Sequence, residues 1–327
     1  MLYPLTFNPA FKERVWGGRN LERLYQKQLP PEIPVGESWE ISDRAETTSV
    51  IRNGPLAGKS LRWLMEHCQA ELFGDAQPTD SRFPLLVKIL DADERLSLQV
   101  HPPDAIAKRL GGEPKAELWY VAATRPGAEI YAGLKHGVTR DEFTGRIRDG
   151  TVADCLHRLS VRPGDAIFLP GGRVHAIGAG VVIFEIQQNS DTTYRIFDWN
   201  RKGLDGKPRE LQVEQSLQSI DFKDFEPKLV PAGFEKRDGL DVRILVRNSP
   251  FSVCECTLPA QAGVQLDCRQ MTILGLLSGS VAIVHGALGT TLTPGGFCLL
   301  PSSLGKVMLD SKSGAHFLKT TLVDPAA

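Results

Sequence analysis

The sequence of 327 residues lacks any bias of charge: 38 Lys and Arg residues stand against 39 Asp and Glu residues, for a formal net charge of −1. A neutral balance gives no general attraction for nucleic acid or for an anionic membrane surface. The chain also lacks a run of about 18 apolar residues, and its first residues lack the basic start and apolar core of a signal peptide. We therefore expect a cytoplasmic protein that binds neither nucleic acid nor membrane.

Cysteine is scarce and scattered, with six residues in the chain, of which only Cys254 and Cys256 lie close together. A zinc finger needs a second, matching cysteine pair, and none follows. Reduced thiols in a cytosolic protein are the simpler interpretation. If Cys254 and Cys256 lie on a strand they share one face, because alternate residues of a strand point the same way.

The remaining composition is that of a globular protein, with 42% hydrophobic and 24% charged residues, in a chain long enough for one large domain or two ordinary ones. Short apolar runs between turn residues predict a mainly β protein with a few short helices. Strands are expected at residues 83–90, 97–100, 118–123, 166–169 and 181–187, and helices at 60–74, 104–110, 139–148 and 151–159. The best linker is 229–239, and short strands follow it.

One segment, from Pro163 to His175, joins two glycine and proline turns to a short apolar strand and then presents a single histidine. Its spacing, Gly-x5-Pro-x-Gly-x2-His, is similar to the second half of the cupin signature, in which that histidine is a metal ligand on a β-barrel strand. A core histidine without a metal would be an equally ordinary interpretation of His175 alone.

The same turn chemistry recurs 131 residues later, where Pro294 to Pro301 repeats the Gly-x5-Pro spacing. At this offset Lys306 replaces His175, and a lysine ammonium has no lone pair to offer a metal. We therefore predict two cupin (double-stranded β-helix) barrels in tandem. Residues 1–235 would form the metal-binding catalytic domain, with a helical insertion near 139–160, and residues 236–327 a degenerate domain without a metal site.

The other ligands can be sought on an earlier strand. Gln99 and His101 lie two apart and so share a strand face, and Glu117 opens the next apolar strand. A buried carboxylate needs a partner, and a metal is such a partner. With His175 these residues offer two imidazoles, a carboxylate and an amide, a set that suits Zn²⁺, with Mn²⁺, Fe²⁺ or Co²⁺ as substitutes.

At these residues the chain resembles the type I mannose-6-phosphate isomerases in their short bacterial form, over nearly its whole length. The matching motifs are LSLQVHP at 96–102, PKAELWY at 114–120, GRVHAI at 172–177 and NSDTTYRIFDW at 189–199. The resemblance implies interconversion of mannose 6-phosphate and fructose 6-phosphate, with one zinc ion per chain held by the residues that match the family's ligands. These are Gln99, His101, Glu117 and His175.

The resemblance also implies the groups that surround the sugar phosphate. Arg195 matches an active-site arginine of the family, and Lys115 and Ser97 lie two residues before the ligands Glu117 and Gln99. Cations and a hydroxyl suit a phosphate dianion. We predict substrate binding by Ser97, Lys115, Arg195 and Lys88, with catalytic roles for Arg195, Lys115 and Glu185. Glu185 is the candidate base, and Lys115, a zinc-bound water or the ligand set itself are its rivals.

Two other functions stay open at this stage. His101, Glu117 and His175 are also the two histidines and carboxylate of an Fe²⁺ cupin oxygenase, although Gln99 then occupies a position that oxygen chemistry would leave open. A non-catalytic sugar-phosphate-binding cupin is the other alternative. For the isomerase we expect a small-molecule hexose phosphate as the binding partner and a monomer or weak homodimer.

Overall fold

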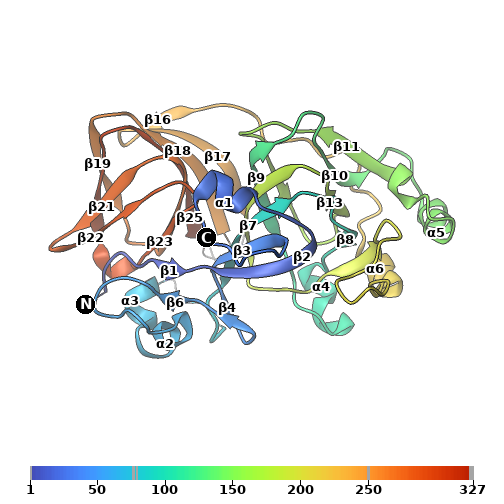
Figure 1. Ribbon diagram of the computed structural model, residues 1–327, viewed down its shortest axis with the longest axis horizontal. Coiled ribbons are helices and arrows are strands. Elements are labelled where there is room, and N and C mark those ends of the chain that lie inside the picture. The colour runs from blue at the N-terminus through green and yellow to red at the C-terminus, as the bar shows by residue number, and fades with distance from the viewer. Residues whose placement is uncertain (1, 76–77, 79, 249–250, 324–327) are drawn as a thin grey trace.

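The computed structural model describes residues 2–75, 78, 80–248 and 251–323, and its secondary structure is mainly strand (Figure 1). Four larger sheets carry most of the chain, and they form two pairs. Figure 1 shows the pair built from residues before about 230 from the centre to the right, in blue through green to yellow, and the later pair mostly on the left, in orange and red. No helix among the described residues is long and apolar enough to cross a membrane.

The first pair joins a six-stranded and a five-stranded sheet. The six-stranded sheet has the order β12 (Ala166–Leu169), β9 (Glu117–Thr124), β14 (Val181–Gln188), β7 (Leu85–Ala92), β3 (Val35–Ile41) and β2 (Ala10–Gly18). The five-stranded sheet has the order β11 (Leu156–Ser160), β10 (Glu129–Leu134), β13 (His175–Ile177), β8 (Leu98–Val100) and β15 (Tyr194–Phe197).

The second pair joins a six-stranded and a four-stranded sheet. The six-stranded sheet has the order β16 (Glu235–Arg237), β17 (Leu240–Asn248), β18 (Phe251–Leu258), β25 (Ala315–Leu322), β20 (Thr272–Gly279) and β23 (Phe297–Leu300). The four-stranded sheet has the order β19 (Ala262–Asp267), β24 (Lys306–Ser311), β21 (Val281–His285) and β22 (Leu288–Leu292). Read in reverse, β23, β20, β25, β18, β17 and β16 take the places of β12, β9, β14, β7, β3 and β2. In the other sheet β22, β21, β24 and β19 take the places of β11, β10, β13 and β8, and β15 has no counterpart.

The central strand β7 shows why these sheets stack. Leu85, Val87 and Ile89 on one face belong to a core that also contains residues of β18, β20 and β23. Leu90 and Ala92 on the other face belong to a second core between the two sheets of the first pair. A strand with both faces buried is mostly apolar, and in β7 only Lys88 and Asp91 interrupt the apolar run. The two six-stranded sheets therefore pack against each other in the middle of the molecule.

The repeated turn has the structure that its sequence predicts. Ala166–Leu169 and Phe297–Leu300 are both four-residue strands, displaced by the same 131 residues. Gly164 and Gly295 ahead of them have φ of 94° and 76°, a left-handed conformation that glycine adopts without strain. His175 and Lys306 both open the strand that follows. The division at residue 235, and the description of the two sheet pairs as two closed barrels, stay predictions.

The helices are short, as expected, and lie outside the sheets. They are α1 (Asn20–Tyr25), α2 (Leu61–His67), α3 (Gln69–Phe73), α4 (Asp104–Ala107), α5 (Arg140–Arg148) and α6 (Val213–Ser219), with 3-10 turns at Lys108–Leu110, Val152–Cys155 and Ser302–Leu304. The predicted helix at 60–74 is broken at Cys68, although Ser60 caps its first part by accepting a hydrogen bond from the Trp63 N–H. Two-residue strands complete the chain: β1 (Phe7–Asn8), β4 (Asp43–Arg44), β5 (Thr47–Thr48) and β6 (Val50–Ile51).

The expectation of a helix at 151–159 is wrong. Only Val152–Cys155 form a helical turn, and Leu156–Ser160 form the edge strand β11 beside β10. In β11 the alternate residues Leu156, Arg158 and Ser160 are buried, exposed and exposed in turn, whereas His157 and Leu159 are half-buried. Only Leu156 of this edge strand is fully buried, and Leu159 packs against a core while half-exposed. The polar residues between and after them resemble those of a surface helix.

Candidate active site

Three strands deliver the predicted metal ligands to one point. His101 directly follows β8, Glu117 opens β9 and His175 opens β13. Backbone packing fixes the approach of His101: a Cβ on Gly171 would lie 2.6 Å from the Cα of Pro103, so only glycine allows the two loops to touch. The Gly172 N–H then donates to the His101 carbonyl oxygen at 2.8 Å.

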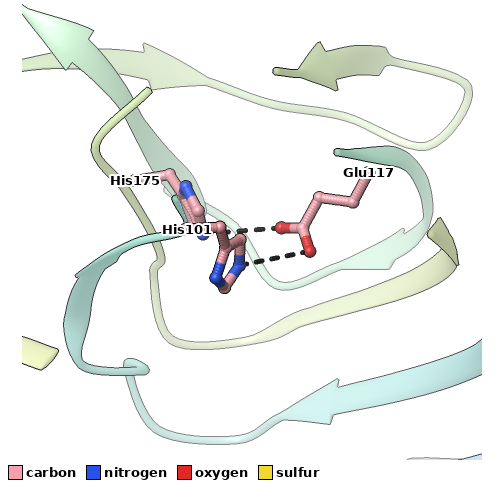
Figure 2. A group of neighbouring side chains, drawn as sticks. All are labelled: His101, Glu117 and His175. Atoms are coloured by element: carbon pink, nitrogen blue, oxygen red, sulfur yellow. Dashed lines mark ion pairs between the residues drawn. The ribbon is translucent and has the colours of Figure 1, made fainter. Parts of the chain in front are cut away.

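The three side chains are almost fully buried and face one another (Figure 2). The Nε2 atoms of His101 and His175 each lie 3.4 Å from a different carboxylate oxygen of Glu117. Their ligating atoms all fall within 4.8 Å of one another. This is the spatial cluster that the sequence predicted for a divalent metal.

The outer nitrogens of both imidazoles are already engaged. His101 Nδ1 lies 2.9 Å from the Thr192 carbonyl oxygen and His175 Nδ1 lies 2.9 Å from the Arg173 carbonyl oxygen. A carbonyl can only accept, so each Nδ1 carries the proton and each Nε2 keeps a lone pair directed at Glu117. Metal-binding histidines are held in this way. Neither oxygen of Glu117 accepts a well-directed hydrogen bond from the described residues. Buried polar atoms need a partner, so the two Nε2 atoms and the Glu117 oxygens fit a cation between them.

The protonation states agree with this fit. Burial, reinforced by the nearby Lys115 ammonium, lowers the pKa of His101 to about 4, and burial lowers the pKa of His175 as well. Burial alone would raise the pKa of Glu117, but Lys115 and the two histidines outweigh it and hold that pKa well below its usual range. At neutral pH the cluster therefore consists of two neutral imidazoles and one carboxylate.

Gln99, the fourth predicted ligand, adjoins the cluster. It pairs with His175 in the register of β8 and β13, and its Nε2 atom lies 3.4 Å from His175 Nε2. An amide oxygen and nitrogen can exchange places by a flip of the side chain, so Gln99 can also present its oxygen. On its other side Gln99 pairs with Arg195 of β15. The register of the five-stranded sheet thus places the predicted arginine next to the predicted ligand.

A cavity of about 640 Å³ opens beside this cluster. All five predicted substrate and catalytic residues line it: Lys88, Ser97, Lys115, Glu185 and Arg195. Its volume lies within the range of small-molecule sites. The structure therefore brings together every site residue named from the sequence, although it does not test the role of any of them.

Lys115 and Arg195 have different surroundings in this cavity. Lys115 Nζ is buried, 2.9 Å from Glu117 Oε2 and 3.1 Å from His101 Nε2. Burial would lower its pKa, but Glu117 and Glu185 raise the pKa above its ordinary value, so Lys115 is an ammonium. Arg195 donates from Nη1 to the Glu210 carbonyl at 2.9 Å, while its buried Nε has no partner among the described residues. Arg195 therefore keeps donor capacity for a ligand.

Glu185 and Lys88 form a buried ion pair on neighbouring strands, with Nζ 3.2 Å from Glu185 Oε1. The Trp119 indole N–H donates to the other oxygen, Oε2, at 3.0 Å. A lysine on a buried, apolar strand needs an anionic neighbour, and Glu185 supplies it. Oε1 accepts no well-directed hydrogen bond from the described residues, so the Lys88 ammonium is the charged group that it faces.

The sequence reasoning missed the wall formed by β2 and β3. Glu37 lies in the cavity, 2.8 Å from Arg14 Nε, and the Trp39 indole N–H donates to it at 2.6 Å. Burial would raise the pKa of Glu37, but Lys88 and Arg14 outweigh it and lower this pKa to about 2. The available signal was a carboxylate in the fully buried strand Val35–Ile41, where a charge needs a partner.

Comparison with known proteins identifies the family. Residues 5–117 match the family described as phosphomannose isomerase type I, catalytic domain. A probable mannose-6-phosphate isomerase of Bacillus subtilis (strain 168), GmuF, is 36% identical over 95% of this chain and 97% of its own length. The mannose-6-phosphate isomerase ManA of the same organism is 37% identical over 94% of this chain and 96% of its own.

Solved structures agree. The crystal structure of a Bacillus subtilis mannose 6-phosphate isomerase superposes with a TM-score of 0.89 at 30% identity, and the match covers 98% of this chain and 99% of that one. Family, length and fold coincide from the first strand to the last. The chain therefore belongs to the type I phosphomannose isomerases, a family of isomerase enzymes.

Proposed function

We propose that the chain is a zinc-dependent isomerase that interconverts mannose 6-phosphate and fructose 6-phosphate through an enediol(ate). The observation that carries the metal is the cluster of two lone-pair nitrogens around a buried carboxylate, with Gln99 beside it. A related isomerase, 17% identical and of the same fold, is described as bound with zinc and yttrium, which supports zinc as the ion here. Gln99, His101, Glu117 and His175 would hold one ion per chain.

The reaction moves one proton between C1 and C2 of the open-chain sugar. Zinc, when bound, polarises the oxygens on these carbons and stabilises the negative charge of the enediolate. Glu185 is the carboxylate that takes and returns the proton, because it lines the cavity with one oxygen held by Trp119 and the other free of a directed hydrogen bond. Such proton transfer needs a base within hydrogen-bond reach of carbon-bound hydrogen.

The remaining lining residues bind and orient the sugar phosphate. Arg195, at the cavity wall beside Gln99, is a planar fork suited to phosphate oxygens, and Ser97 supplies a hydroxyl. Lys115 donates to a substrate oxygen near the metal ligands, and Lys88 holds Glu185 in place at 3.2 Å. A substrate bound at both ends is limited to the orientation in which C2 faces Glu185.

A coupled assay tests the proposal, with mannose 6-phosphate supplied and fructose 6-phosphate detected. Exhaustive chelation should remove turnover, and stoichiometric Zn²⁺ should restore it, with one ion per chain by elemental analysis. Full turnover in protein that contains no metal would refute the zinc mechanism. Oxygen uptake on a sugar substrate, without isomerisation, would instead support the Fe²⁺ oxygenase, although the named relatives are isomerases.

A further inference from the structure

A second cavity, of about 900 Å³, opens between the two sheets of the second pair. It occupies the same place in the strand order as the candidate active site. In the first pair Lys88 of β7 pairs with Glu185 of β14, and in the second pair Cys254 of β18 pairs with Lys319 of β25. We call it the C-terminal cavity and define it by Arg237, Arg247, Cys254, Lys306 and Lys319.

Two equivalent positions are more positive in the second cavity than in the first. Register places Lys319 where the first cavity has the Glu185 carboxylate. The repeat places Lys306 where the first cavity has His175. The result is a lining in which cations converge from β16, β17, β24 and β25. Only Asp238 and Asp267 oppose them among the lining carboxylates.

Most of this positive charge is not neutralised within the protein. Asp267 is paired with Arg269, which lies outside the cavity, and Arg237 is paired with Glu235. Within the described ranges, Lys306, Lys319 and Arg247 have no carboxylate oxygen within 4.0 Å. By contrast, Lys88 and Lys115 in the first cavity each have a carboxylate at 3.2 Å or closer. Asp267 lies opposite Lys306 and offsets part of its charge, but the four lining cations outnumber the two lining carboxylates. An excess of cations in a concave site attracts an anion.

Arg237, Arg247 and Lys319 line the same cavity as the thiol of Cys254. Burial raises the pKa of Cys254, and Lys319, Arg247 and Arg237 oppose that rise. The three cations lie on β16, β17 and β25, which belong to the same sheet as β18, and all three line the cavity together with Cys254. Cys254 is half-buried, whereas its neighbour on the same face, Cys256, is buried. Both thiols line the cavity, and Cys254 is the more exposed of the two.

We propose that the C-terminal cavity binds a phosphorylated small molecule through Lys306, Lys319 and Arg247. The ligand is small because the cations line a concavity of ligand size and do not form an extended surface stripe. It is an anion because the lining charge is positive. A phosphate group satisfies several ammonium and guanidinium donors at once. The site is separate from the metal centre and does not depend on the proposed isomerase mechanism.

Alkylation of Cys254 gives a local readout of occupancy. The protein is treated with iodoacetamide at mildly alkaline pH, and mass spectrometry follows the modification of each cysteine peptide. Inorganic phosphate and mannose 6-phosphate are the probes, and unphosphorylated mannose is the uncharged control. At about ten times the dissociation constant of a probe, alkylation of Cys254 should become about tenfold slower by mass action. The rate at the half-buried Cys68, outside the cavity, should not change.

Two single variants and one control locate the site. Lys306→Ala and Lys319→Ala should each weaken protection by about tenfold, because a charge-assisted contact is lost. Lys312→Ala removes an exposed lysine outside the cavity and should leave protection unchanged. Isomerase turnover reports that each variant is folded. If one variant does not fold, the wild-type protection curve and the other variant still test the proposal.

The two probes distinguish the source of the phosphate. Equal protection by both means that the site recognises the phosphate group alone, and protection by mannose 6-phosphate at much lower concentration means that the sugar is recognised too. Either result supports the proposal. Saturable protection by neither probe, or protection that persists unchanged in both lysine variants, would overturn it.

Discussion

The two sheet pairs have the same strand order, but only the first carries a cluster of metal ligands among the described residues. His175 and Gln99 pair across β13 and β8, and Lys306 and Asp267 pair at the equivalent point of β24 and β19. Glu117 lies opposite Leu169, and the corresponding partner of Leu300 is Thr272. The second pair thus preserves the backbone of the candidate site, whereas Lys306, Asp267 and Thr272 stand in place of His175, Gln99 and Glu117.

This difference separates the parts of the motif that fold the chain from those that perform chemistry. The turn glycines and the apolar strands β12 and β23 recur in both halves, and both strands pack into cores. The histidine occurs only once. The turn recurs because it stabilises the fold of both halves. The histidine that follows it is needed only in the half proposed to hold a metal.

The largest effect is expected from exchanging the two residues that differ. His175→Lys places the second pair's residue in the metal site, where an ammonium beside Glu117 repels a divalent ion. Turnover and zinc content should both be lost, beyond the roughly 100-fold that weakening a supporting contact of a metal site costs. The converse change, Lys306→His, should leave both unaltered, because Asp267 and Thr272 do not complete a ligand set.

Elemental analysis of the two purified variants, with the coupled isomerase assay, checks this prediction. A His175→Lys protein that keeps one zinc per chain would contradict the ligand assignment. A second zinc in Lys306→His would contradict the distinction between the two halves.

The site could be predicted from sequence wherever its parts lie in local patterns. Gln99 and His101 share a face because of the strand period, Glu117 opens an apolar run, and the turn motif positions His175. These residues converge because strands far apart in the sequence, such as β8 and β13, pair with each other. The spacing of residues does not predict such pairings, and the family resemblance did.

Two features could not be predicted for physical reasons. Glu37 belongs to the cavity because β3 lies beside β7, a long-range pairing that nothing near Gly36 or Trp39 indicates. The helix expected at 151–159 failed because the edge strand β11 buries little, and burial is what gives a strand its alternating pattern. Local propensity decides neither case.

A second test changes the buried carboxylate at the position where the halves differ in sign. Glu185→Gln keeps the shape and the hydrogen bond from Trp119 but removes the base, so kcat should fall by about 10²- to 10⁴-fold with KM nearly constant. Lys319→Gln, at the equivalent position of the second pair, should leave both constants unchanged. Steady-state kinetics with mannose 6-phosphate measures this, and near-normal kcat in Glu185→Gln would remove Glu185 as the base.

The contact between the halves should be sensitive to a single ion pair. Arg243 of β17 lies 2.8 Å from the buried Glu255 of β18, which also accepts hydrogen bonds from Tyr120 of β9 and from His316 of β25. Arg243→Met leaves Glu255 buried without its cation, which should cost about 3–5 kcal/mol. Urea unfolding at neutral pH measures the loss. The exposed Arg269→Met is the matched control, and a similar loss there would show that the effect is not specific.

Arg195 offers a smaller test, because β15 has no counterpart in the second pair. Arg195→Ala should raise KM for mannose 6-phosphate by about tenfold, as expected for one charge-assisted contact to a phosphate. Arg247→Ala, in the C-terminal cavity, should leave KM unchanged. Equal increases in KM for the two variants would show that Arg195 attracts the substrate only through the net charge of the protein and does not contact the bound phosphate.

The smallest effect is a change in how stability depends on pH. Burial raises the pKa of Glu255, but hydrogen bonds from His316, Tyr120 and Arg243 outweigh it and hold that pKa below its ordinary value. A carboxyl with a depressed folded-state pKa contributes stability above its unfolded pKa of about 4.3, and this contribution is lost as the pH falls through the folded value. Wild-type protein should therefore lose stability on acidification in this window. In Arg243→Met the loss should be smaller, because protonation relieves the unpaired carboxylate. Urea midpoints at neutral pH and near pH 4 measure the difference, and parallel losses in the two proteins would show that Arg243 does not set the charge of Glu255.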